Sequence, residues 1–201
     1  RPMKTLRVVH HTMTGGTAQM VEAAVHAARS EGGVGVLTRR AFDAAAADVL
    51  GADGYLFATP ENLAAISGAL KDFFDRTYYA ALDRINGRPY AVMVCAGTDG
   101  GMAVRQIERI ATGWRLRAVA EPLIVRTGAQ APEDILAAKR IDEVSLRRCA
   151  ELGQALAAGL ADHVWFQVGR RRGQAALRFL CRVSLEPDNC VSNTRYWFRR
   201  L

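Results

Sequence analysis

Short apolar runs alternate with amphipathic stretches over the first 161 residues of the chain. Runs of about four to eight apolar residues bounded by turn residues are typical of buried strands. Between them, apolar residues recur every three or four positions, which is typical of helices with one buried face. The pattern predicts strands at 6–10, 34–38, 54–59, 90–95 and 116–125, and helices that begin near residues 17, 41, 68, 102 and 132, the last of them continuing to about 160.

Strand and helix therefore alternate five times, which predicts parallel strands joined by right-handed crossovers, with helices on both faces of the sheet. Ligands of such sheets bind beyond the carboxyl ends of the strands. Three loops follow strands at that edge, namely 11–17, 60–67 and 96–101. We therefore expect these three loops to build the binding site.

The first loop combines three threonines with a Gly-Gly pair at the start of a helix. Its residues are His11, Thr12, Met13, Thr14, Gly15, Gly16 and Thr17. A helix N-terminus leaves backbone N–H groups unpaired and carries partial positive charge, so it attracts phosphate. The loop has neither the lysine of a nucleoside-triphosphate loop nor the G-x-G-x-x-G spacing of a dinucleotide site, which favours a terminal monophosphate. The alternative is a helix-capping turn that binds nothing.

The other two loops are weaker signals. Residues Pro60, Glu61, Asn62 and Leu63 offer backbone groups, an amide and apolar side chains to a flat ring. Residues Ala96, Gly97, Thr98, Asp99, Gly100 and Gly101 allow the backbone to approach a ligand closely. Taken alone, either loop could be a simple connection. Together with the first loop, they predict a ligand with a monophosphate at one end and an aromatic ring system at the other.

Two motifs carry a resemblance to a known family. The T-x-T-G-x-T spacing of residues 12–17 resembles the phosphate loop of flavodoxins. The segment 59–76 begins T-P-E-N and ends S-G-A-L-K-D-F-F-D-R, and it is similar to flavodoxin-like NAD(P)H-dependent FMN reductases and quinone reductases. The loop 96–101 is also similar to theirs. The resemblance covers about residues 3–161 and leaves out residues 162–201.

The resemblance implies a flavodoxin-like α/β three-layer sandwich whose five-stranded parallel sheet has the order 2-1-3-4-5. It implies FMN as the cofactor, with the phosphate on residues 12–17 and the ring between 60–63 and 96–101. Hydride would pass from NADPH or NADH through the flavin to a quinone or similar small acceptor, without a catalytic side chain. A homodimer or tetramer is also implied. Unlike flavodoxins proper, neither ring loop contains an aromatic residue, which leaves room for a nicotinamide or quinone to stack.

The basic charge is concentrated at the C-terminal end of the chain. The 201 residues have a formal net charge of +7, and residues 162–201, with eight arginines and three acids, carry +5 of it. We therefore expect a domain at 3–161 and a basic C-terminal extension, in which residues 175–183 could form one apolar face of a helix. One alternative to a reductase is a flavodoxin-type electron carrier, although such carriers are typically acidic. Another is a non-enzymatic module that binds nucleic acid or membrane through the extension.

Most of the other reactive residues favour structural roles. The four cysteines lack the spacing of metal ligands and the start of the chain lacks a secretory leader, so we expect reduced thiols in a cytoplasmic protein. Cys95 and the pair Asp75-Arg76 are expected to be structural. His10 is expected to pack against a neighbour, whereas His11 could donate a hydrogen bond to the phosphate.

Overall fold

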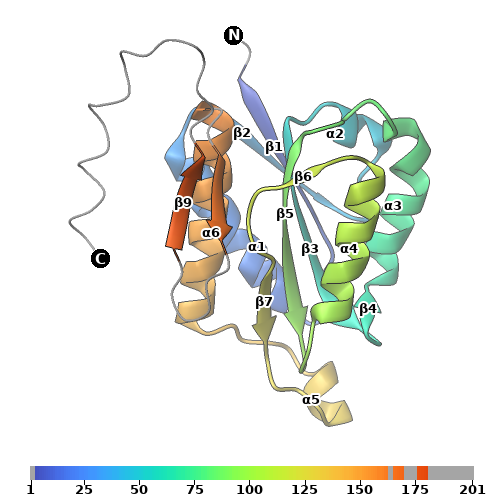
Figure 1. Ribbon diagram of the computed structural model, residues 1–201. Coiled ribbons are helices and arrows are strands. Elements are labelled where there is room, and N and C mark those ends of the chain that lie inside the picture. Colours follow the sequence, from blue (N-terminus) through green and yellow to red (C-terminus); the bar gives the residue numbers. More distant parts are fainter. Residues whose placement is uncertain (1–2, 163–164, 170–175, 181–201) are drawn as a thin grey trace, which may run out of the picture.

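Strands and helices alternate along the chain much as the hydrophobic pattern predicts (Figure 1). The computed structural model describes residues 3–162, 165–169 and 176–180. The strands are β1 (Lys4–His10), β2 (Val34–Arg40), β3 (Gly54–Asn62), β4 (Ala65–Ile66), β5 (Pro89–Ala96), β6 (Arg117–Ala118), β7 (Leu123–Arg126), β8 (Trp165–Gly169) and β9 (Ala176–Leu180). The helices are α1 (Gly16–Glu31), α2 (Ala46–Leu50), α3 (Gly68–Ala81), α4 (Gly101–Gly113), α5 (Pro132–Leu136) and α6 (Glu143–Asp162).

The main sheet is parallel and has the order β2-β1-β3-β5-β6, with β7 also paired to β5. β5 is the predicted fourth strand, and β6 and β7 are two parts of the predicted fifth strand, so the predicted order 2-1-3-4-5 is confirmed. The fifth strand divides around Pro122, which has no N–H group for the ladder. The register pairs His10 of β1 with Ala58 of β3, and Ala58 with Met93 of β5, so the carboxyl ends of these strands lie at one edge.

Helices cover both faces of the sheet, which confirms the flavodoxin-like three-layer sandwich (Figure 1). α1 and α6 pack on one face, where Met20 and Leu156 belong to one buried cluster. α2, α3 and α4 pack on the other face. There the ring of Phe57 lies 5.2 Å from that of Phe74 and 6.5 Å from that of Trp114. Within the described residues, no helix is both long and apolar enough to cross a bilayer.

The segment after β7 differs most from the prediction. One helix was expected from 132 to 160, but α5 ends at Leu136 and α6 begins only at Glu143. Ala137 is already extended, with φ −66° and ψ 150°. The residues between the two helices form hydrogen bonds with the first loop of the site, and these bonds replace the backbone hydrogen bonds of a continuous helix.

Three smaller expectations are also corrected. The predicted helix at 41–50 begins only at Ala46, after a turn. The predicted loop 60–67 is a hairpin, because β3 continues to Asn62 and pairs antiparallel with β4. Residues 176–180 form strand β9, paired antiparallel with β8, rather than part of a helix. The rest of the predicted helix, including residues 181–183, lies outside the described residues, and the boundary at 161 stays a prediction.

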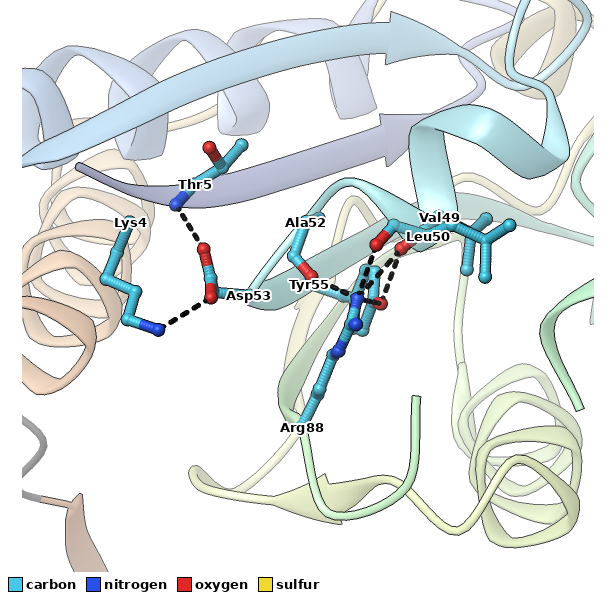
Figure 2. Close-up of polar contacts among 8 residues, drawn as sticks. All are labelled: Lys4, Thr5, Val49, Leu50, Ala52, Asp53, Tyr55 and Arg88. Atoms are coloured by element: carbon cyan, nitrogen blue, oxygen red, sulfur yellow. Dashed lines mark hydrogen bonds and ion pairs between the residues drawn. The ribbon is translucent and has the colours of Figure 1, made fainter. Parts of the chain in front are cut away.

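The amino-terminal end of the sheet is held by three charged side chains (Figure 2). The Arg88 guanidinium lies just before β5 and donates to carbonyls at the C-terminal end of α2, including Leu50 at 2.9 Å, where a cation is favoured. The Asp53 carboxylate accepts from the Lys4 ammonium at 2.8 Å and from the Thr5 N–H at 2.9 Å. These contacts lock β1, β3 and β5 at the edge opposite the three predicted loops.

Candidate functional site

The three predicted loops contact one another at the carboxyl edge of the sheet. The Asn62 amide donates to Met13 Sδ at 3.1 Å, which joins the hairpin to the first loop. The Gly100 N–H donates to Glu61 Oε2 at 2.8 Å, which joins the third loop to the hairpin. The structure therefore brings 11–17, 60–63 and 96–101 into one continuous site, while their role as FMN ligands stays a prediction.

The first loop leaves the N-terminus of α1 open to an anion. Gly15 adopts φ +85° before the helix, and its N–H donates to Thr12 Oγ1 at 3.2 Å. The first turn of α1 contains no acidic residue. The Thr17 side chain is only 1% exposed, and its hydroxyl has no hydrogen-bond partner within the described residues. A buried hydroxyl is costly unless it is bonded, so this atom suits a ligand oxygen.

Gly16 allows the first loop to lie directly against β5. A Cβ at Gly16 would lie 2.7 Å from Cys95 Sγ and 3.2 Å from the Lys139 Cβ, which is too close for any larger residue without movement. Cys95 is buried and forms no disulfide within the described residues, and burial raises the pKa of its thiol. Its predicted role as a small core residue is confirmed.

A segment that sequence reasoning missed clamps the first loop from outside. The Gln19 amide nitrogen donates to the carbonyls of Gly15 (3.1 Å) and Lys139 (2.7 Å), and its oxygen accepts from the Ile141 N–H (3.1 Å). The Lys139 N–H donates to the Thr14 carbonyl at 2.8 Å. No local sequence pattern predicts this clamp, because its two halves lie 120 residues apart in the sequence.

The T-P and S-G parts of the second motif are joined by their hydroxyl groups. The Ser67 N–H donates to Thr59 Oγ1 at 3.1 Å, and Ser67 Oγ accepts from the Leu70 N–H at 3.3 Å as the N-cap of α3. Between them, Leu63 (φ 50°) and Ala64 (φ 58°) adopt left-handed conformations at the hairpin turn. Such conformations are strained for residues with a Cβ and often mark functional sites.

The third loop is supported by residues 126–129. A Cβ at Gly97 would lie 2.6 Å from the Ala129 carbonyl oxygen, so only glycine fits there. The Gly128 N–H donates to the Gly97 carbonyl at 2.8 Å, and Arg126 Nε donates to the Asp99 carbonyl at 3.1 Å. The segment from β7 to α6 therefore holds both the first and the third loop.

The two histidines lie at the end of β1 beside the first loop. The His11 ring meets Phe42 edge-on at 5.6 Å, and Phe42 is 65% exposed at this edge, a contact that the sequence did not predict. Burial lowers the pKa of His10, with smaller contributions from His11 and Arg40, and burial also lowers the pKa of His11. Both Nδ1 atoms lack a partner within the described residues. Donation from His11 to a phosphate stays a prediction.

We expect the free energy of unfolding of the apoprotein to fall as the pH is lowered from about 7.5 to about 5.5. The folded state favours neutral imidazoles, so the unfolded chain binds more protons once the pH drops below the ordinary histidine pKa of about 6.5. Urea unfolding at several pH values across this window measures how steeply the free energy of unfolding depends on pH. The double variant His10→Asn/His11→Asn should flatten it, and an unchanged slope would contradict this assignment.

The D-R end of the second motif holds the fold together, as predicted. The Arg76 guanidinium donates to the carbonyls of Ala41 and Ala44, each at 3.0 Å, and to Asp72 Oδ2 at 2.7 Å. Asp75 pairs with Lys71 at 2.6 Å rather than with its neighbour. Arg76 thus ties α3 to the turn after β2.

Two curated proteins are similar to part of the chain. A flavodoxin of Aquifex aeolicus (strain VF5) is 32% identical over 99 residues, which cover 49% of this chain and 54% of that protein. An NAD(P)H dehydrogenase (quinone) of Acidithiobacillus ferrooxidans (strain ATCC 53993 / BNL-5-31) is 28% identical over 120 residues, which cover 49% of this chain and 60% of that protein. The chain therefore spans between about half and three fifths of the length of these relatives.

The fold and the family are shown by two further comparisons. A flavodoxin from the domain Archaea superposes with a TM-score of 0.62 at 16% identity, covering 78% of this chain and 98% of that one, which shows a shared fold. Residues 10–127 match the model of a family described as NADPH-dependent FMN reductase. This match takes in more than half of the chain and all three loops, which confirms the resemblance seen in the motifs, and the chain belongs to the NADPH-dependent FMN reductase family.

Proposed function

We propose that the chain is an FMN-dependent NAD(P)H oxidoreductase that binds FMN at the carboxyl edge of its sheet. The observation that carries the proposal is the joining of all three loops at that edge, through Met13–Asn62 and Glu61–Gly100. Membership of a family described by FMN and NADPH supports the choice of cofactor and electron donor.

The residues present fit FMN. At residues 12–17, an acid-free helix N-terminus and the Thr17 hydroxyl, which has no partner in the part of the chain that the structure describes, suit a phosphate. Backbone N–H groups near Asn62 and Gly97 would place partial positive charge beside the ring. When bound, FMN supplies the hydride chemistry, while the protein supplies binding and orientation. No side-chain acid or base is needed, so we assign no catalytic residue.

A flat, apolar acceptor such as a quinone fits the exposed side chains of this edge. Large apolar side chains are exposed on four separate segments around the site, and neither ring loop contributes an aromatic cover. These side chains are Met13, Phe42, Leu63 and Met102. The Acidithiobacillus relative carries quinone in its name. A homodimer or tetramer and a cytoplasmic location remain predictions.

The test is the visible absorption spectrum of the purified chain after FMN has been added and the excess removed by desalting. Absorption bands at about 375 and 450 nm, which belong to the cofactor, should be retained. The loaded protein should then oxidise NADPH or NADH when a soluble quinone is supplied. A colourless protein that cannot retain FMN would overturn the proposal.

A flavodoxin-type electron carrier is the second candidate, because the Aquifex relative is a flavodoxin and is 32% identical. This alternative predicts retained FMN but slow NAD(P)H oxidation, with reduction in two separate one-electron steps. Against it, residues 1–161 carry only +2 of the net charge, whereas such carriers are typically acidic. Stopped-flow reduction by NADPH, compared with one-electron titration, separates the two functions.

A further inference from the structure

The side-chain amide of Gln19 joins the first loop to the segment between α5 and α6. Its nitrogen donates to the Gly15 carbonyl at 3.1 Å and to the Lys139 carbonyl at 2.7 Å. Its oxygen accepts from the Ile141 N–H at 3.1 Å. A glutamine amide has two N–H donors and one oxygen, so every polar group of this side chain takes part in the connection.

The same segment also holds the preceding peptide of the first loop. The Lys139 N–H donates to the Thr14 carbonyl at 2.8 Å, and the N–H of that peptide, on Gly15, is bonded within the loop. Gln19 bonds the carbonyl of the next peptide, which joins Gly15 to Gly16. Two successive peptide planes of the first loop are therefore fixed by Lys139 and Gln19.

The position of the Gly15 carbonyl determines the direction of the Gly16 N–H. In a trans peptide, the carbonyl and the N–H lie in one plane and point in opposite directions. The Gly15 carbonyl accepts from the backbone N–H of Gln19 at 3.2 Å as well as from its side chain, so it points along α1. The Gly16 N–H therefore points out of the helix, toward the place where an anion binds at a helix N-terminus.

The glycine pair makes this part of the loop costly to order. Gly15 adopts φ +85°, and the next residue is again glycine, which loses more conformational freedom on folding than any other residue. A loop that is already ordered in the free protein does not lose this freedom when the ligand binds, which strengthens binding. Gln19 supplies such order from outside the loop.

We propose that Gln19 is a positioning residue for phosphate recognition, which holds the Gly15–Gly16 peptide so that the Gly16 N–H faces the phosphate of FMN. This inference rests on the proposed function. In this role Gln19 acts through the peptide that it holds rather than by contact with the flavin. It increases the preference of the chain for FMN over riboflavin, because the N–H that it orients bonds only to the phosphate.

The first test compares Gln19→Met with Gln154→Met. Methionine is close to glutamine in length but has no amide, and Gln154 is exposed on α6, where its amide donates to Glu31 Oε2 at 2.7 Å. Gln19→Met should weaken FMN binding about tenfold and riboflavin binding by less than about twofold. Gln154→Met should leave both affinities unchanged, and thermal unfolding checks that both variants keep the fold.

Equal losses of affinity for the two flavins in Gln19→Met would overturn the inference, because they would show a purely structural role. An unchanged FMN affinity in this variant would also overturn it, while leaving the proposed function in place. Failure of the wild-type chain to bind FMN would overturn the proposed function as well.

The second test uses the wild-type chain alone. FMN should slow amide hydrogen exchange at Lys139 and Ile141, because a phosphate on the first loop and the bonds of the clamp stabilise each other. Riboflavin should leave the exchange at these two amides nearly unchanged, since it has no phosphate. Equal slowing by both flavins, or slowing by neither, would overturn the inference.

Discussion

Thr14→Glu should abolish FMN binding, with a loss of affinity of at least about a hundredfold. Thr14 lies two residues before α1, and its carbonyl is held by the Lys139 N–H at 2.8 Å, so its backbone has little freedom to move away. A carboxylate here would occupy the place of the phosphate. Two unit charges of like sign about 4 Å apart near a protein surface repel by about 4 kcal/mol. Titration of FMN fluorescence measures the loss.

Two controls separate loss of the phosphate site from loss of the fold. Thr14→Ser keeps the hydroxyl and should retain most of the affinity. Riboflavin has no phosphate. The affinity for riboflavin should therefore differ much less between Thr14→Glu and the wild-type chain than the affinity for FMN does. Unchanged FMN affinity in Thr14→Glu would refute the assignment of residues 12–17 to the phosphate.

Gly153→Ala should lower the free energy of unfolding by about 3 kcal/mol or more. Gly153 lies in α6 against α1, and a Cβ there would stand only 2.0 Å from the Ala24 carbonyl oxygen. Because that atom belongs to the backbone, the two helices would have to separate and expose their shared core. In an open helix the same substitution normally stabilises by up to about 1 kcal/mol, so the expected sign is opposite to helix propensity.

Gly68→Ala is the matched control, because a Cβ at this first residue of α3 meets nothing within 4 Å. We expect it to be neutral or slightly stabilising. Urea unfolding of both variants, followed by circular dichroism, provides the comparison. Equal stability of Gly153→Ala and the wild-type chain would show that α1 and α6 do not pack as closely as described.

Local patterns predicted the strand order because each main strand is a short apolar run whose partners follow from right-handed crossovers. The same patterns missed the β3–β4 hairpin. Its turn uses Leu63 and Ala64 in left-handed conformations, where glycine or asparagine would have been the expected signal. The hairpin matters for the site, because it carries Glu61 to the start of α4.

The alanine-rich segment 131–142 illustrates how tertiary contacts override propensity. Its composition favours a helix, yet the backbone groups of Lys139 and Ile141 bond to Thr14 and Gln19 instead of to the next turn. The Lys139 ammonium also bonds to three carbonyls around the end of α5, including that of Ala137. These bonds end the helix at Leu136 and create the clamp on the first loop.

The sequence by itself determined the order of strands and helices, the edge at which ligands are expected, and the phosphate and ring motifs, since each depends on neighbours a few residues apart. Only the tertiary structure decided which polar groups stay unbonded at that edge. It buries Thr17 and one oxygen of Glu61 without partners among the described residues, and it joins Gln19 to a segment 120 residues away. Such features depend on distances between separate loops, because burial and hydrogen-bond satisfaction are properties of the packed chain rather than of any local pattern.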